Sequence, residues 1–209
     1  MRIDYTSKRF TFISGFTHWL RSVQRKHRLQ LQPTGTIDFG SLRRLRPVSR
    51  VFGLDRGLPI DRYYIEKFLS SYSDDIKGHV LEIGDNYYTK KFGNDRVTKS
   101  DILHVVNGNP KATIVADLTN ADNIYSNSFD CIIFTQTLQM IYDIDSAMKQ
   151  LQRILKPDGL LLVTTHGISK IGRREGKDNW GEYWHFTSQS ISKFFLKYFL
   201  EVVPLRWTG

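Results

Sequence analysis

The stretch HVLEIGD, residues 79–85, decides the fold of this chain of 209 residues. Its apolar start predicts a buried β-strand, and Gly84 predicts a turn directly after that strand. Asp101 and Asp117 follow at the expected ends of a second and a third strand, and a further apolar run begins at Phe129. This order of strands, turn and acids is typical of a parallel sheet that binds a nucleoside cofactor at the carboxyl ends of its strands.

Strands and helices alternate along the chain, which predicts an α/β fold with a mostly parallel sheet covered by helices on both faces. The expected strands are His79–Ile83, Arg96–Leu103, Thr113–Ala116, Phe129–Phe134, Leu160–Thr164 and a short last one, Glu201–Leu205. The expected helices are an amphipathic basic one over 10–28, one from Pro59 to about Ser71, a short one around Tyr87–Phe92, one over Ser146–Leu155 and a last one capped by Ser188. Asp143 or Asp145 can cap the fourth of these helices, and the run 156–159 should end it and turn the chain.

Cysteine content and hydropathy limit the classes to which this protein can belong. The single cysteine, Cys131, excludes an internal disulfide and a zinc cluster built on cysteines, and its apolar neighbours indicate a small core residue. No stretch reaches the roughly 18 apolar residues that a membrane span requires. The first residues also lack the apolar segment of a signal peptide. We therefore expect an intracellular, cytoplasmic protein.

The formal net charge of +9 is placed unevenly. Residues 1–60 hold 12 Lys and Arg against 3 Asp and Glu, whereas the rest of the chain is balanced. Such a basic arm suits an anionic partner, such as a phosphate, a nucleotide-sugar, a membrane surface or nucleic acid, although a solvated basic face explains it equally well. The helix over 10–28 can lie on an anionic membrane or, as is commoner, cap the core of its own domain.

The acids and the glycine form the predicted cofactor site. Gly84 lets a ligand approach the backbone closely, and Glu82 and Asp85 flank it. Asp101 stands at the spacing at which a carboxylate binds ribose hydroxyls, and Asp117 or the amide beside it can meet the adenine edge. Carboxylates complement a positively charged sulfonium, whereas the pyrophosphate of NAD would need a glycine-rich helix start that is missing here. Taken singly, Glu82 can contact a helix, Gly84 can be an ordinary turn glycine and Asp101 can be a turn or cap residue.

Several segments resemble class I S-adenosylmethionine-dependent methyltransferases, namely LEIGD, VADL, FDCIIFTQTLQMIYD, LKPDGLLLVTT and WGEYWHFT. With VFGLDRGLPIDRYYIEKFL and DILHV, they are most similar to methyltransferase domains of bacterial and viral surface-glycan pathways, over roughly residues 45–200. The resemblance implies a Rossmann-like domain over 51–209 after a basic helix and strap over 1–50. It also implies S-adenosylmethionine as cofactor and O-methylation of a sugar hydroxyl in a glycan or glycoconjugate. Such domains often lie beside or are fused to glycosyltransferases, which suggests a glycosyltransferase as partner or fusion.

Three departures from the family pattern stand out. His166 lies where these proteins tend to have proline, and His185 where they tend to have arginine in a YWRFT motif. Only nine residues follow Leu200, so the final antiparallel hairpin of the fold looks truncated.

Five further residues are assigned to the cofactor. Thr135 and Gln136 follow the fourth strand and can hydrogen-bond the cofactor or the acceptor. Leu118 supplies the amide that follows the acid at the end of the third strand. By the resemblance, Arg62 and Tyr63 hold the methionine carboxylate or close over it. The alternatives are a surface charge for Arg62 and a core aromatic for Tyr63.

Methyl transfer to a hydroxyl requires that acceptor, methyl and sulfur be aligned, and a positioned base helps because it takes the hydroxyl proton. His166 directly follows the fifth strand and is the first candidate base, and His185, in an aromatic loop, is the second. A structural hydrogen bond is the alternative for each histidine. Glu182, Asp178 and Asp61 are reserve bases. Aromatic rings like those of the loop are common platforms for sugars.

Some sugar methyltransferases position hydroxyls with Mg²⁺, which takes several oxygen ligands. No clustered acidic triplet stands out in this sequence. We therefore predict no metal.

Two other functions stay open. The basic arm suits an RNA-directed methyltransferase or a nucleic-acid-binding protein, but no RNA-binding module or set of base-stacking aromatics is recognisable, so nucleic acid is the less favoured partner. The reduced glycine motif suits a catalytically inactive scaffold with a methyltransferase fold.

Overall fold

The computed structural model describes residues 45–46, 49, 53–169, 171–174 and 180–199. The chain divides into two compact units, Met1–Asp55 and Arg56–Gly209. The basic helix expected over 10–28, the last strand expected over 201–205 and the reserve base Asp178 lie outside the described residues. Nearly all of the basic arm does so too.

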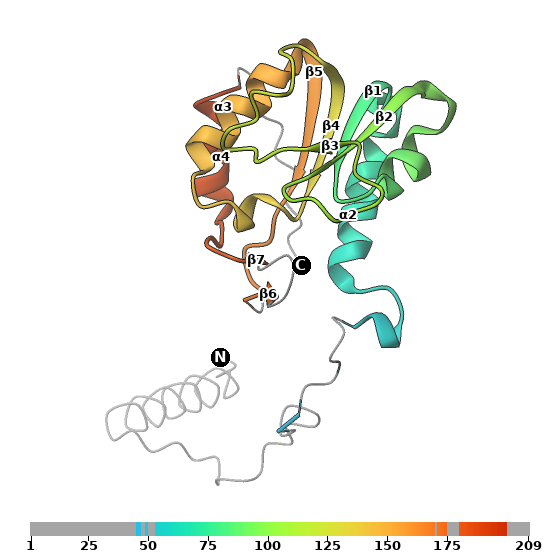
Figure 1. The fold of residues 1–209 in the computed structure, drawn as a ribbon. Coiled ribbons are helices and arrows are strands. Elements are labelled where there is room, and N and C mark those ends of the chain that lie inside the picture. The colour runs from blue at the N-terminus through green and yellow to red at the C-terminus, as the bar shows by residue number, and fades with distance from the viewer. Residues whose placement is uncertain (1–44, 47–48, 50–52, 170, 175–179, 200–209) are drawn as a thin grey trace, which may run out of the picture. The chain divides into compact units, whose positions relative to one another are not determined.

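The second unit is built on a five-stranded sheet in the order β3-β2-β1-β4-β5 (Figure 1). All of its strand pairs are parallel. The strands are β1 Gly78–Ile83, β2 Val97–His104, β3 Ile114–Val115, β4 Phe129–Thr135 and β5 Leu155–Thr164. The chain moves outward from β1 to β3, and then returns to β4 on the other side of β1. The predicted Rossmann-like α/β fold is confirmed, and the strand order reverses between β1 and β4.

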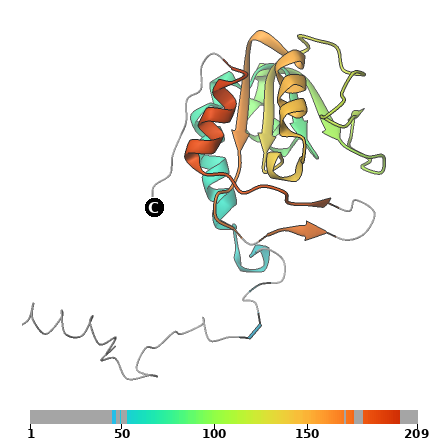
Figure 2. The same cartoon turned by 90° about the vertical axis from the view of Figure 1, so that its left-hand side faces the viewer.

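Helices cover both faces of this sheet because successive strand residues point to opposite faces and are apolar on both. On one face, α2 (Ile60–Ser71) buries Ile65 and Leu69 against one hydrophobic cluster, which includes Cys131. On the other face, α3 (Ile144–Ile154) and α4 (Ser188–Leu196) pack into a second cluster and lie side by side (Figure 2). Burial raises the pKa of the Cys131 thiol to about 12, in agreement with a core residue.

The helix starts follow from local capping. The Asp143 carboxylate accepts hydrogen bonds from the Ser146 amide at 3.0 Å and from the Ser146 hydroxyl at 2.7 Å, which confirms the first of the two predicted caps of α3. Helix α4 begins at Ser188, but its cap is Thr187, not the predicted Ser188. Thr187 and Ser190 form a reciprocal capping box, in which each side chain accepts a hydrogen bond from the other residue's amide.

Three predicted boundaries needed correction. Strand β5 begins at Leu155, because the expected turn over 156–159 is a bulge between two paired parts of the strand. Strand β2 runs through His104, so Asp101 is not its last residue. The short helix expected around Tyr87–Phe92 is present, but most of it is a π-helical turn, Thr89–Gly93, which ends one residue later than predicted.

The remaining elements are short. In the described part of the chain, 3₁₀ turns cover Leu54–Arg56, Ser73–Asp75, Asn94–Arg96 and Leu138–Met140, the last of them labelled η6. Strands β6 (Arg173–Arg174) and β7 (Trp180–Gly181) form an antiparallel pair within what the sequence indicated as a loop. This pair lies beyond the carboxyl end of β5 (Figures 1 and 2). None of the helices that the structure describes is both long and apolar enough to cross a bilayer.

Candidate functional site

The carboxyl ends of the parallel strands share one edge of the sheet, where ligands bind in folds of this kind. Most of the predicted site residues lie along this edge. The turn after β1 carries Gly84 and Asp85, and the segment after β3 carries Asp117. Gln136 follows β4, and His166 follows β5.

The turn after β1 leaves its backbone accessible. Gly84 has a φ of +82°, and among the described residues no heavy atom beyond Gly84 and its two chain neighbours lies within 4 Å of the position that a Cβ would take. The Asn109 side-chain amide donates to the Gly84 carbonyl at 2.6 Å, which ties the loop after β2 to this turn. Asp85 is exposed, and one carboxylate oxygen accepts from the Tyr87 amide at 3.0 Å. An exposed carboxylate and a glycine with open space beside its Cα therefore lie together at the end of β1, although the Gly84 amide donates a hydrogen bond to the Leu103 carbonyl.

Glu82, the buried residue two positions before Gly84, holds the segment after this turn by hydrogen bonds. Its buried carboxylate accepts hydrogen bonds from the amides of Tyr88 at 3.1 Å and Thr89 at 2.8 Å, and from the Thr89 hydroxyl at 2.7 Å. Burial raises the pKa of Glu82 to about 6, although the hydrogen bonds from Thr89 and Tyr88 act in the opposite direction. These contacts explain why the chain folds back after Gly84.

Asp101 does not lie at the edge. It is buried within β2, paired in register with Leu81, and its carboxylate binds His79 Nε2 at 2.6 Å, Lys99 Nζ at 2.9 Å and Thr113 Oγ1 at 2.8 Å. Burial opposes ionisation, but the hydrogen bonds from Lys99, His79 and Thr113 keep the pKa of Asp101 below its ordinary value. The expectation of an acid at the end of β2 is therefore wrong, since that position belongs to His104.

The residues after β3 divide between core and surface. Asp117 is exposed and accepts hydrogen bonds from the amide and the hydroxyl of Thr119, at 2.8 and 2.9 Å. The Leu118 side chain is buried in the hydrophobic core. Only the backbone of Leu118 is thus available for a polar contact with a ligand.

The start of α2 is tied to the turn after β1. Arg62 Nη1 donates to the Tyr88 hydroxyl at 2.7 Å, and Tyr88 is the residue whose amide binds Glu82. Tyr63 is 53% exposed, so it is not the core aromatic of the alternative interpretation. Its ring packs edge-on against Tyr64.

A network of polar side chains joins the ends of β4 and β5. Gln136 adopts a φ of +48°, and its amide donates to the carbonyl of Thr164 at 2.8 Å. Its Oε1 lies 2.9 Å from His166 Nδ1 and accepts from Gln139 Nε2 at 3.3 Å. The buried Gln139 in turn accepts from the Thr165 hydroxyl at 3.2 Å. Thr135 ends β4 and pairs with Thr164.

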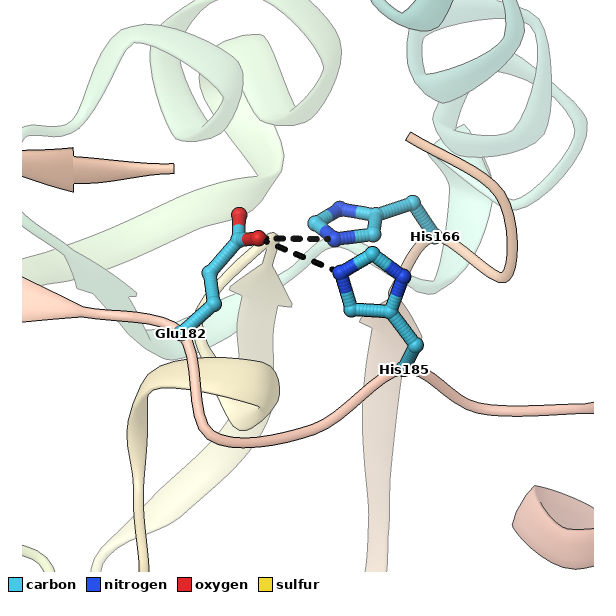
Figure 3. Close-up of side chains that lie close together, drawn as sticks. All are labelled: His166, Glu182 and His185. Carbon is cyan, nitrogen blue, oxygen red and sulfur yellow. Dashed lines mark ion pairs between the residues drawn. The ribbon is translucent and has the colours of Figure 1, made fainter. Parts of the chain in front are cut away.

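The two candidate bases lie together. Glu182, just after β7, faces both of them, with its Oε2 3.5 Å from His166 Nε2 and 3.4 Å from His185 Nε2 (Figure 3). The two imidazole rings are 5.0 Å apart between centroids. Gly172 holds Glu182 in place, since its amide donates to Oε2 at 2.9 Å and its carbonyl accepts from the Glu182 amide. We call His166, Glu182 and His185 the histidine–glutamate cluster.

Aromatic side chains stand next to this cluster. The amide of Tyr183 donates to the carbonyl of Gln139 at 2.8 Å, and Trp184 Nε1 donates to the carbonyl of Ile141 at 2.9 Å. These bonds fasten the segment after β7 over η6. The Tyr142 ring packs against both Tyr183 and Trp184, and all three side chains are exposed. They form an aromatic surface beside the cluster.

Comparison with known proteins identifies the family. A sequence profile described as a methyltransferase domain matches residues 61–201. The chain belongs to this methyltransferase domain family. No curated protein matches the chain in sequence.

The solved structures that match this methyltransferase domain share little sequence with it. An S-adenosylmethionine dependent methyltransferase from Mesorhizobium loti matches with a TM-score of 0.46 and 12% identity, over 66% of this chain and 79% of that one. The N-methyltransferase NodS from Bradyrhizobium japonicum WM9, in complex with S-adenosyl-L-homocysteine, matches with a TM-score of 0.40 and 18% identity, over 50% and 61%. YcgJ from Bacillus subtilis matches with a TM-score of 0.41 and 17% identity, over 50% and 51%. The chain spans about half the length of the first structures it matches, at 51%, 47% and 55%.

Sequence reasoning treated the two histidines of this methyltransferase domain as separate candidates and Glu182 as a reserve base. The structure brings all three together, which no spacing rule would predict for His166, because a hairpin separates it from the other two. Glu182 and His185, three residues apart in WGEYWH, were the only local signal. Gln139, which positions Gln136, was not singled out at all. The reserve base Asp61 lies at the start of α2.

Proposed function

We propose that this methyltransferase domain transfers the methyl group of S-adenosylmethionine to a sugar hydroxyl of a glycan or glycoconjugate. The observation that carries the proposal is the histidine–glutamate cluster, which follows β5 at the edge where parallel sheets bind ligands. The cofactor occupies the neighbouring position, where the strand order reverses between β1 and β4.

The cofactor half of the proposed site uses the turn after β1 and its neighbours. Gly84 offers open space for the close approach of a ligand, and Asp85 and Asp117 offer exposed carboxylates that complement an adenosine bearing a positive sulfonium. The Leu118 amide is assigned to the adenine edge. Asp101 is removed from this half, because His79, Lys99 and Thr113 already bind its carboxylate.

Two further pairs complete the cofactor half. Arg62 and Tyr63 lie at the start of α2, and the bond from Arg62 to Tyr88 ties them to the turn after β1. They are assigned to the methionine carboxylate. Thr135 and Gln136, at the end of β4, are assigned to the side where cofactor and acceptor meet.

The acceptor half must take a proton from the attacking hydroxyl. Gln136 Oε1 faces His166 Nδ1 at 2.9 Å, so Nδ1 carries the proton and Nε2 carries a lone pair. During transfer, the acceptor oxygen forms a bond to the methyl carbon, the bond from that carbon to sulfur breaks, and the hydroxyl proton passes to His166 Nε2. Glu182, 3.5 Å from that nitrogen, stabilises the resulting imidazolium. His185 is the second base.

Two features support a sugar as acceptor. The exposed rings of Tyr142, Tyr183 and Trp184 offer flat apolar surface beside the cluster, of the kind on which sugar rings stack. A hydroxyl also needs a base, whereas many amine acceptors are already nucleophilic as neutral groups.

Mass spectrometry tests the proposal. Candidate glycans incubated with the protein and S-adenosylmethionine should gain the mass of one CH₂ group for each methyl transferred, and S-adenosylhomocysteine should form in equal amount. Incubation without the protein is the control. Cofactor turnover with amine or oligonucleotide acceptors but with no glycan would contradict the sugar assignment.

A further inference from the structure

We propose that His166, Glu182 and His185 bind a divalent transition-metal ion. Each residue offers one ligand atom, and these three atoms all lie within 4.8 Å of one another (Figure 3). Within the described ranges, no other group of three His, Cys, Asp or Glu residues comes together in this way. Metal binding is independent of the proposed function, whereas the role we give the ion in catalysis rests on that function.

The Nε2 atom of His166 faces the Glu182 carboxylate. Gln139 Nε2 donates to Gln136 Oε1, which makes that oxygen the acceptor for His166 Nδ1–H. The neutral ring then carries its lone pair on Nε2. This nitrogen is buried, has no hydrogen-bond partner among the described residues, and faces a carboxylate oxygen of Glu182. A lone pair facing a carboxylate is unfavourable unless a positive charge lies between them.

The distances fit a shared metal better than direct hydrogen bonds. The separations of 3.5 and 3.4 Å from the Glu182 oxygen exceed the usual range of about 2.7–3.2 Å for an N–H···O bond. Zinc takes nitrogen and oxygen ligands at about 2.0–2.2 Å in a tetrahedral arrangement, which places two ligand atoms roughly 3.4 Å apart.

The ligands are held in position by their own partners. His166 binds Gln136 through its second ring nitrogen, and Glu182 Oε2 accepts from the Gly172 amide at 2.9 Å. Metal-binding histidines usually donate their other N–H to an oxygen, and such partners fix the ring for binding. The side chains of His166 and Glu182 are also only 17% and 10% exposed, which limits their freedom to move.

The ligand types select the class of metal. Two imidazole nitrogens and one carboxylate suit zinc and its first-row neighbours, whereas Mg²⁺ prefers oxygen ligands throughout. Three protein ligands leave a coordination position open, as in catalytic zinc sites. The prediction of no metal from sequence considered only clusters of acids, and this proposal departs from it.

Within the proposed reaction, the ion would hold the acceptor oxygen at its open position and favour loss of the hydroxyl proton. The proton leaves to solvent, the oxygen forms its bond to the methyl carbon, and the bond to sulfur breaks, which leaves a neutral thioether. In this version His166 is a ligand and not the free base. Through the ion, the three side chains would therefore both orient the acceptor hydroxyl and lower the free energy needed to remove its proton.

Metal titration of the full-length protein tests the inference. After treatment with a chelator, the protein should bind one equivalent of Co²⁺ with visible absorption bands of a four- or five-coordinate site, and Zn²⁺ should displace it. His166→Ala and Glu182→Gln should each weaken binding by at least about tenfold. The matched control is His104→Ala, which removes a histidine outside the cluster and should leave Co²⁺ affinity unchanged. Circular dichroism checks that each variant is folded.

Two results would overturn the inference. One is a folded wild-type protein that binds Co²⁺ no more tightly than Glu182→Gln, and the other is an equal loss of affinity in His104→Ala. The proposed function fails separately. If the protein binds no metal but forms methylated glycan, only the metal site is disproved. If it binds metal tightly but forms no methylated glycan, only the glycan assignment is disproved.

Discussion

Two opposing effects act on the pKa of the Glu82 carboxyl group. Burial disfavours its charge and raises its pKa to about 6, while three hydrogen-bond donors from Tyr88 and Thr89 favour the charge. The effect of burial is the larger one, so the folded state favours the protonated form of Glu82 more than the unfolded state does. The apolar run before Glu82 made a buried strand predictable. The donors that face Glu82 come from the start of the short helix predicted around Tyr87–Phe92, but the sequence did not indicate the π-helical form of that helix.

This balance predicts a dependence of stability on pH. Because the folded-state pKa of Glu82 lies above its ordinary value of 4.5, its contribution is fully present below about pH 4.5 and is lost as the pH rises through 6. The rise in pKa corresponds to about 2 kcal/mol. Urea unfolding of wild type and of Glu82→Gln should be measured from about pH 4 to pH 8. The unfolding free energy of wild type relative to Glu82→Gln should fall by about 2 kcal/mol as the pH rises across this range. A constant difference would show that Glu82 is not perturbed.

His166 carries the prediction for catalysis. His166→Ala should lower kcat for glycan methylation by about 10²–10⁴-fold, because it removes either the base or a metal ligand. Affinity for S-adenosylmethionine, measured by calorimetry, should stay within about twofold, since the residues assigned to the cofactor lie in α2 and at the ends of other strands. Unchanged turnover would remove His166 from the reaction.

At the scale of elements, Asp101 connects three strands. It lies in β2, binds His79 from β1, and binds Thr113 just before β3. The spacing from Gly84 made it a plausible ribose ligand. Spacing along the chain does not show how far the strand continues, and three more residues of β2 follow it.

Replacing Asp101 should therefore affect the fold more than the cofactor. Asp101→Asn should lower the unfolding free energy by about 1–3 kcal/mol, because it removes the charge that three partners bind. Its affinity for S-adenosylmethionine should change by less than about twofold. The exposed Asp117 provides the control, since Asp117→Asn should cost little stability. A stable Asp101→Asn protein with greatly weakened cofactor binding would restore the ribose role.

The elements themselves could be predicted well where patterns are local. Alternation of apolar runs and amphipathic segments predicted all five strands of the sheet. Asp143, one of the two predicted caps, caps α3, which begins two residues before the predicted start at Ser146. The extension of β5 back to Leu155 could not be predicted, because the Pro157–Gly159 segment indicates a turn and only pairing with β4 carries the strand past it. The β6–β7 pair is too short to leave a period in the sequence.

At the scale of the whole molecule, the chain reversal between β1 and β4 decides where the two reactants can meet. Most segments assigned to the cofactor follow β1 and β3, and His166 of the histidine–glutamate cluster follows β5. Gln136, which follows β4, lies between them and contacts His166. Sequence alone predicted this edge and its acids Asp85 and Asp117, whereas Asp101, also predicted there, is buried within β2. It could not predict the cluster, because the contact of His166 with Glu182 depends on how the segment after β5 folds back. The basic arm, with its suggested anionic partner, lies almost wholly outside the described residues.

Calorimetric titration with S-adenosylmethionine tests the central claim most directly. The wild-type protein should bind one equivalent, and Gly84→Ala should bind at least about tenfold more weakly, because a side chain at positive φ strains the turn and places a methyl group where the ligand approaches. Gly57→Ala is the matched control, since Gly57 also has a positive φ and open space around it but lies outside the turn. Equal affinity of Gly84→Ala and wild type, or no binding by either, would contradict the account.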